Sequence, residues 1–140
     1  MSFLSVLIKS QTVVSLPSSA SVYEAAQLMA ENKVGSVVVM DGDELSGIFT
    51  ERDLLNRVVA RGLDPKSTQL SLVMSKDVVV CPVTETVKDC FKKMEATKCR
   101  HLPVVDGKKV AGMVTMRNIL EWLFAEAEEE KNQLRKYIQS

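Results

Sequence analysis

The sequence contains an internal repeat with an offset of 65 residues. Residues 13–55 align with residues 78–120 over 43 positions without a gap, and 13 of these positions are identical. Other positions keep their chemical class, as where Asp53 faces Asn118. One repeat unit of about 55–60 residues buries too little apolar surface to be stable alone, so the two copies are expected to pack together. The repeat therefore predicts one globule with approximate twofold symmetry.

Each copy carries the signals of one element order, β-α-β-β-α. Ser21 and Thr86 are placed to cap a first helix, and Thr50 and Thr115 to cap a second one. Asp-Gly pairs mark a tight turn between two apolar strands of each copy. The predicted strands are 12–16, 37–40 and 45–49 in the first copy and 78–81, 102–105 and 110–114 in the second. The fold class is therefore α/β (α+β), built as a tandem pair.

These patterns also set the expected domain organisation. The first repeat covers 4–61, a Pro-containing linker 62–69, the second repeat 70–124, and a C-terminal helical extension 125–140. Charged residues dominate 126–131, and Leu134, Tyr137 and Ile138 follow near the end. Two interpretations of this extension stay open. It meets a partner subunit, or it lies on its own domain with a solvated glutamate face.

Charge and hydropathy exclude several function classes. The chain has 18 Lys and Arg and 18 Asp and Glu, so it lacks the cationic surplus that non-specific nucleic-acid binding needs. No apolar run approaches the roughly 20 residues that span a bilayer. The first eleven residues do not read as a secretory signal. We therefore expect a cytoplasmic protein, with an organelle as the alternative if a targeting segment has been removed.

The cysteine and histidine pattern argues against a metal site and against catalysis. Cys81, Cys90 and Cys99 lack the close pairing typical of zinc ligands, and His101 is the one histidine. Cys99 and His101 share a strand face, but Cys99 takes the place that apolar Val34 holds in the first copy. A packing role for Cys99 is therefore favoured over a nucleophilic one. No catalytic residue and no metal ligand is predicted, and the protein is expected not to be an enzyme.

The two strand-to-helix junctions read G-I-F-T-E-R-D at 47–53 and G-M-V-T-M-R-N at 112–118. This doubled pattern, in register inside a gapless repeat, resembles the cystathionine-β-synthase (CBS) domain pair. The chain is similar to the stand-alone CBS-pair proteins, which have no catalytic domain. The resemblance covers about residues 4 to 122.

The residues of the first junction have chemistry suited to a nucleotide. Thr50 marks a helix start, where a hydroxyl and free N–H groups suit an anion. Asp53 lies one turn further along, where a carboxylate can accept both hydroxyls of a ribose. Arg52 adds a cation. The alternative is that Thr50 and Asp53 serve only the helix start.

The resemblance implies two nucleotide sites between the copies. The first comprises Ile48, Thr50, Arg52, Asp53, Asp77, Val78, Cys99, Arg100 and His101. The second comprises Thr12, Val13, Val34, Gly35, Ser36, Met113, Thr115, Arg117 and Asn118. Arg100 and His101 would contact phosphate in the first. We expect the second to be weaker, because Asn118 lacks charge and Gly35 stands where the first has Arg100.

The expected function is that of a regulatory module without an obligatory cofactor. It would bind an adenine nucleotide, AMP foremost, with ADP, ATP or S-adenosylmethionine as alternatives. The resemblance also implies a homodimer and an unidentified regulated protein, for which redox proteins such as thioredoxin are the suggested class. The rival interpretation is a dimeric interaction scaffold with an empty cleft.

Overall fold

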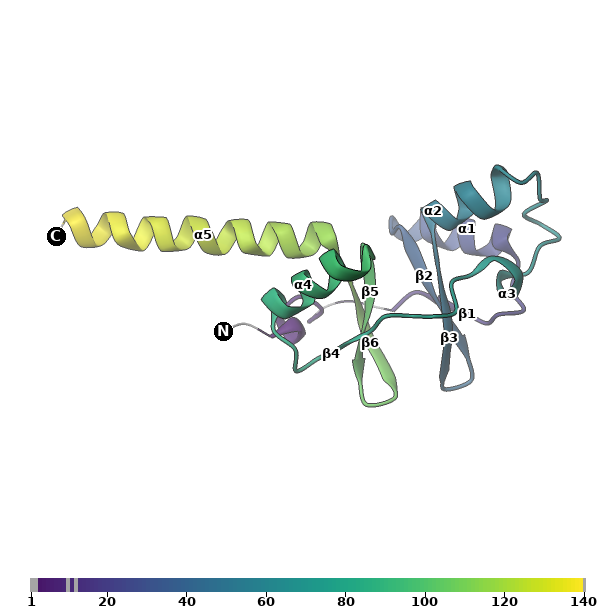
Figure 1. Ribbon diagram of the computed structural model, residues 1–140, viewed down its shortest axis with the longest axis horizontal. Coiled ribbons are helices and arrows are strands. Elements are labelled where there is room, and N and C mark those ends of the chain that lie inside the picture. Colours follow the sequence, from purple (N-terminus) through teal and green to yellow (C-terminus); the bar gives the residue numbers. More distant parts are fainter. Residues whose placement is uncertain (1–2, 10, 12, 140) are drawn as a thin grey trace.

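The computed structural model describes residues 3–9, 11 and 13–139. Two three-stranded sheets have the same strand order, β1-β2-β3 and β4-β5-β6 (Figure 1). In both sheets the first strand pairs parallel to the second, and the second pairs antiparallel to the third. The strands are β1 (Ser15–Leu16), β2 (Ser36–Asp41), β3 (Glu44–Thr50), β4 (Cys81–Pro82), β5 (His101–Asp106) and β6 (Lys109–Thr115). The predicted α/β tandem repeat is confirmed.

Helices alternate with the strands in the predicted order. The two long helices that follow the first strands are α1 (Val22–Asn32) and α4 (Val87–Thr97). The helix after β3 is α2 (Glu51–Asp53), continued by a π-helix, η2 (Leu54–Val59), whereas the helix after β6 is the long α5 (Met116–Gln139). Two short helical turns, η1 (Leu4–Val6) and α3 (Leu70–Val73), open the two repeats and were not predicted.

The strand register of the two sheets is the same, residue for residue. Ser36 faces Thr50 in the first sheet, and their equivalents His101 and Thr115 face each other in the second. The register shifts at the same place in both hairpins, after Val39 and after Val104. The duplication in the sequence is therefore a duplication of backbone hydrogen bonding.

The predicted caps and turns are present. Ser21 Oγ accepts a hydrogen bond from the Glu24 N–H at 3.1 Å, and Thr86 Oγ1 accepts one from the Asp89 N–H at 3.1 Å. Gly42 and Gly107 have φ of 64° and 62° at the hairpin turns. Such positive φ values at the first turn position favour glycine, which has no Cβ.

The segments that lead into each repeat are exchanged between the two hydrophobic cores. Leu70, Val73 and Met74, which open the second repeat in sequence, pack into the core of the first. Leu4 and Ile8 pack instead into the core of the second. The Leu4 N–H donates to the Glu85 carbonyl at 2.9 Å, and the Leu70 N–H to the Ala20 carbonyl at 2.9 Å. Neither core is complete without its partner's segment.

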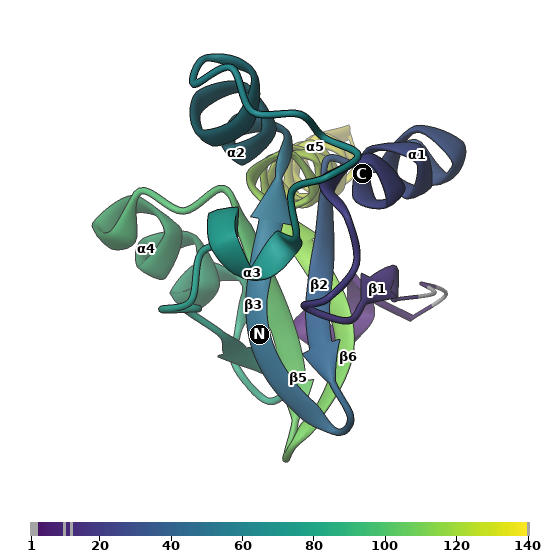
Figure 2. The same cartoon turned by 90° about the vertical axis from the view of Figure 1, so that its right-hand side faces the viewer.

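The two β-hairpins stand side by side in the middle of the molecule, with the helices around them (Figures 1 and 2). The N-terminal part of α5 continues from β6, and Ile119 is fully buried in the second core. The rest of α5 extends well beyond the body as a single rod (Figure 1). The predicted C-terminal helical extension is thus continuous with the last helix of the second repeat.

Candidate functional site

At each strand-to-helix junction, two residues at the start of the helix hydrogen-bond to each other. The Thr50 N–H donates to Asp53 Oδ2 at 3.0 Å, and the Asp53 N–H donates to Thr50 Oγ1 at 3.2 Å. The equivalent pair, Thr115 and Asn118, makes both bonds at 3.1 Å. Each pair is a reciprocal capping box, which satisfies two of the donors that a helix start otherwise leaves open.

A third backbone N–H donor at each junction also has an acceptor within the protein. The Glu51 N–H donates to the Gly35 carbonyl at 3.0 Å, and the Met116 N–H to the Arg100 carbonyl at 2.9 Å. The expectation that free N–H groups of the helix start would face an anion is therefore wrong for these donors. Backbone and side-chain acceptors of the protein already occupy them.

Asp53 already uses part of its acceptor capacity within the protein. Its Oδ2 takes the Thr50 N–H, and its Oδ1 lies 3.6 Å from Arg57 Nε. The Asp53 side chain is only 12% exposed. Asn118 differs in one respect that matters for binding. Its oxygen fills the same capping role, and its amide nitrogen keeps two N–H donors.

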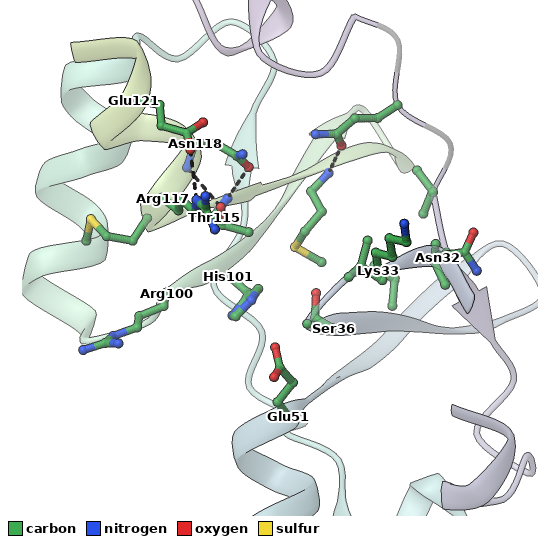
Figure 3. A pocket seen from close by; sticks show the side chains of 18 of the residues that line it. Asn32, Lys33, Ser36, Glu51, Arg100, His101, Thr115, Arg117, Asn118 and Glu121 are labelled. Atoms are coloured by element: carbon green, nitrogen blue, oxygen red, sulfur yellow. Dashed lines mark hydrogen bonds and ion pairs between the residues drawn. The ribbon is translucent and has the colours of Figure 1, made fainter. Parts of the chain in front are cut away.

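A cavity of about 1190 Å³ lies between the two repeats, on the side of the second junction. Its walls come from the start of β2 and the end of α1 in the first repeat, and from β6 and the start of α5 in the second (Figure 3). The lining residues are Gln11, Val13, Val14, Asn32, Lys33, Val34, Gly35, Ser36, Val38, Glu51, Arg100, His101, Met113, Thr115, Met116, Arg117, Asn118, Leu120 and Glu121.

The structure brings together almost all of the second predicted group. Eight of its members line this cavity: Val13, Val34, Gly35, Ser36, Met113, Thr115, Arg117 and Asn118. Thr12 lies outside the described residues. Of the first group, Arg100 and His101 line the cavity. Its other members, Ile48, Thr50, Arg52, Asp53, Asp77, Val78 and Cys99, do not line it.

Gly35 lines the cavity at a point where the protein atoms are closely packed. A Cβ at Gly35 would collide with Oε1 of Glu51 and would stand 3.2 Å from Nε2 of His101. The carboxylate and the imidazole therefore crowd the same face of this residue. Figure 3 shows the Glu51 carboxylate directed toward the His101 ring, with Ser36 beside them. The absence of a side chain at position 35 keeps this end of the cavity open.

Charges of both signs ring the cavity. Arg117 Nε lies 2.9 Å from Glu121 Oε1, and Lys33 lines the opposite wall (Figure 3). The Arg100 side chain is exposed and is directed away from the other labelled side chains. Burial lowers the pKa of His101, against the opposing effect of the nearby Glu51 carboxylate. At neutral pH the imidazole is therefore an uncharged hydrogen-bonding group.

Sequence reasoning missed several lining residues. Lys33 could have been singled out from the sequence, because it recurs as Lys98 in the second copy. In the structure both lysines have positive φ at the end of a helix. Glu51 sits inside the T-x-x-D pattern but was not singled out. Gln11, Asn32 and Glu121 have no counterpart of the same type 65 residues away. No sequence pattern marks them.

The part of the chain that the structure describes contains no group of three or more His, Cys, Asp and Glu side chains placed to hold a metal ion. It also contains no helix long and apolar enough to span a membrane. Cys81 and Cys90 are buried thiols whose sulfur atoms lie 3.2 Å apart.

Comparison with known proteins agrees with this architecture. The sequence is 33% identical over 125 residues to CBSX3, a mitochondrial CBS domain-containing protein of Arabidopsis thaliana, which covers 85% of this chain. The chain spans 60% of the length of that relative. A protein with CBS domains from Burkholderia ambifaria has the same fold, with a TM-score of 0.83 and 29% identity over 89% of this chain and 95% of its own.

A more distant structure shares the fold alone. The CBS domain pair of MJ0100 superposes with a TM-score of 0.81 at 22% identity, covering 90% of this chain and 98% of its own. That structure was solved in complex with 5′-methylthioadenosine and S-adenosyl-L-methionine. The CBS domain family model matches this sequence twice, at residues 8–60 and 70–125. The chain therefore belongs to the CBS domain family, of which it carries a tandem pair.

Proposed function

We propose that this CBS pair is a regulatory module that binds an adenine nucleotide in the cavity between its repeats and thereby alters the activity of a partner protein. AMP is the foremost ligand, with ADP, ATP and S-adenosylmethionine as alternatives. The observation that carries the proposal is the cavity itself. Its lining combines apolar side chains, a polar helix start and cationic side chains. Its volume of about 1190 Å³ is ample for a nucleotide.

The lining matches the three parts of a nucleotide. Val13, Val34 and Met113 offer apolar surface for a base. The Thr115 hydroxyl and the Asn118 amide can bond ribose hydroxyls without breaking the capping box, because each retains hydrogen-bonding capacity. Arg117 and Lys33 stand at the edge as phosphate ligands. The complex of MJ0100 with two adenosyl compounds supports this class of ligand.

Regulation follows from the position of the cavity. A ligand there contacts β2 of the first repeat and the start of α5 in the second, so it favours the relative arrangement of the repeats that best fits it. A partner that distinguishes two arrangements would then respond to the nucleotide. We propose a protein partner, with redox proteins as the first class to test. The proposed compartment is the cytoplasm, with an organelle as the alternative.

A matched pair of arginines tests which of the two junctions binds the nucleotide. Arg117 lines the cavity, and Arg52 holds the equivalent position in the first repeat without lining it. Neither guanidinium takes part in a capping box. Calorimetry of the full chain with AMP should show Arg117→Ala losing about 10-fold or more in affinity, the scale of a hydrogen bond to a charged group, with Arg52→Ala near wild type.

Two outcomes would change the conclusion. A larger loss for Arg52→Ala, or for Asp53→Ala over Asn118→Ala, would place the nucleotide on the first junction, where the sequence predicts the tighter site. Failure of AMP, ADP, ATP and S-adenosylmethionine all to bind would favour the rival function, a dimeric interaction scaffold. The exposed apolar surface of α5 is the observation that keeps this rival in consideration.

A further inference from the structure

A cluster of two thiols and one ion pair lies in the second repeat. Cys81 opens β4 and Cys90 lies in α4, and the Cys81 thiol donates to the sulfur of Cys90 at 3.2 Å. Both cysteines are fully buried. Lys93, one turn along α4 from Cys90, donates from its Nζ to Glu85 Oε2 at 3.1 Å. None of these four residues lines the cavity, so the chemistry of the cluster does not depend on nucleotide binding.

The first repeat shows that the fold does not require this cluster. The equivalent positions, 65 residues earlier, all hold apolar side chains. Leu16, Ala20, Ala25 and Leu28 stand there in place of Cys81, Glu85, Cys90 and Lys93. The four apolar residues belong to the core of the first repeat or pack against it. Because apolar residues satisfy the packing at these positions, the two thiols and their ion pair call for a chemical explanation.

The surroundings make the two thiols unequal. The hydrogen bond from Cys81 lowers the pKa of Cys90 against the effect of burial. The positive charge of Lys93 lowers the pKa of Cys90 as well, while the carboxylate of Glu85 opposes it. The same hydrogen bond raises the pKa of Cys81, as do burial and Glu85. One sulfur is therefore favoured as the thiolate that reacts, and its neighbour as the thiol that follows it.

We propose that Cys81 and Cys90 are a redox-active dithiol, which hydrogen peroxide oxidises to a disulfide between β4 and α4. The Cys90 thiolate attacks one peroxide oxygen, so that an S–O bond forms and the O–O bond breaks. Hydroxide leaves and takes the proton that Cys90 had released. The sulfur of Cys81 then attacks the sulfur of Cys90, the S–S bond forms, and the S–O oxygen leaves with the Cys81 proton as water. The two thiols lose two electrons, and one peroxide becomes two waters.

Burial of the pair selects a small oxidant. Neither cysteine is accessible to a bulky disulfide in the folded chain. The ion pair is the partly open side of the cluster, because the side chains of Lys93 and Glu85 are 30% and 17% exposed. β4 has only two residues and lies at the edge of its sheet, so a local opening there breaks few backbone bonds. The sulfur atoms then approach by about 1 Å to reach the length of a disulfide.

Peptide mapping of the full wild-type chain tests the disulfide. The folded chain is treated with hydrogen peroxide, unfolded in the presence of an alkylating reagent, and digested with trypsin, which cleaves after Lys88 between the two cysteines. The peptides of Cys81 and Cys90 should stay joined until dithiothreitol separates them. Separate peptides, alkylated or carrying added oxygen, overturn the proposal. A disulfide from either cysteine to Cys99, which is partly exposed, overturns it as well.

Two neighbouring lysines test whether the ion pair activates Cys90. Lys93→Gln removes the charge beside the thiols and keeps a hydrogen-bonding side chain, whereas Lys92→Gln removes an exposed charge from the same helix. The rate of disulfide formation at a fixed peroxide concentration should fall about 5-fold or more in Lys93→Gln and match the wild type in Lys92→Gln. Equal rates in the two variants would refute the role of Lys93 in stabilising the thiolate.

Discussion

The side-chain oxygen of Gln11 accepts a hydrogen bond from the backbone N–H of Met113 at 2.9 Å, across 102 residues of sequence. In the other half, Ile48 and Ser75 exchange two backbone hydrogen bonds, at 3.0 and 2.9 Å. Met113 and Ile48 are equivalent positions of the repeat. The lead-in segment of each repeat is thus held against the third strand of the other.

Gln11→Ala should lower the free energy of unfolding by about 0.5–1 kcal/mol, the net value of an exposed hydrogen bond. Gln11→Glu should cost less, because a carboxylate oxygen still accepts from the Met113 N–H. Urea denaturation at neutral pH measures both variants. Equal losses for the two variants would show that the bond itself does not contribute.

Gly47→Ala should destabilise the fold by about 1–3 kcal/mol, as overpacking does. A Cβ at this position would stand 2.7 Å from the carbonyl oxygen of Ser75, and that oxygen is fixed because it accepts from the Ile48 N–H. Glu44→Ala on the same strand is the control, since Glu44 is exposed. Thermal unfolding of Gly47→Ala that matches this control would mean that the two segments are free to separate.

The fold should lose stability as the pH falls through the range of His101. Burial holds the pKa of this imidazole below its ordinary value near 6.5. The unfolded chain therefore takes up a proton more readily, and the stability that His101 contributes is complete above the unfolded pKa and lost as the pH falls through the folded one. His101→Gln should flatten the dependence of unfolding free energy on pH below about pH 6.5, the unfolded value.

The same residue gives a direct spectroscopic check. Because His101 is the one histidine, its ring protons report a single titration. Proton NMR of the wild-type chain should give a midpoint below 6.5. A midpoint above that value would mean that the carboxylate of Glu51, and not burial, dominates the surroundings of the ring.

One of the three cysteines should react with a thiol reagent in the folded protein. Cys81 and Cys90 are fully buried, and Cys99 is partly exposed. The hydrogen bond from the Cys81 thiol to Cys90, together with burial, raises the pKa of Cys81 and keeps it protonated. Titration with a chromogenic disulfide should count one fast thiol before unfolding and three after it. Loss of the fast thiol in Cys99→Ser identifies it.

Much of the fold follows from local signals in the sequence. Caps at Ser21 and Thr86 and the Asp-Gly turns act through backbone groups within a few residues, so a pattern of residue types suffices to predict them. The duplication then predicts that the two halves match. The exchanged packing of Leu4 and Leu70 depends on contacts distant in sequence, and no local pattern reveals it.

The site was predicted only in part, for a similar reason. The residue types of the second group were found, because they are equivalents of the first. Which junction lines this cavity depends on contacts between the repeats, such as the close approach of Gly35 to Glu51 and His101. The sequence offered a helix-start role for Thr50 and Asp53 as an alternative, but it gave no sign that the carboxylate of Asp53 also lies close to Arg57. The relative strength of the two sites stays a prediction.

The reciprocal bonds between Thr50 and Asp53 and between Thr115 and Asn118 bear on how such chains are interpreted. A threonine followed three residues later by an acid or amide is required merely to start the helix. Relatives that have lost every small-molecule ligand would still be under pressure to retain those two residues. Recognising a sensor among them therefore calls for inspecting the neighbours that line the cavity, above all the glycine among them.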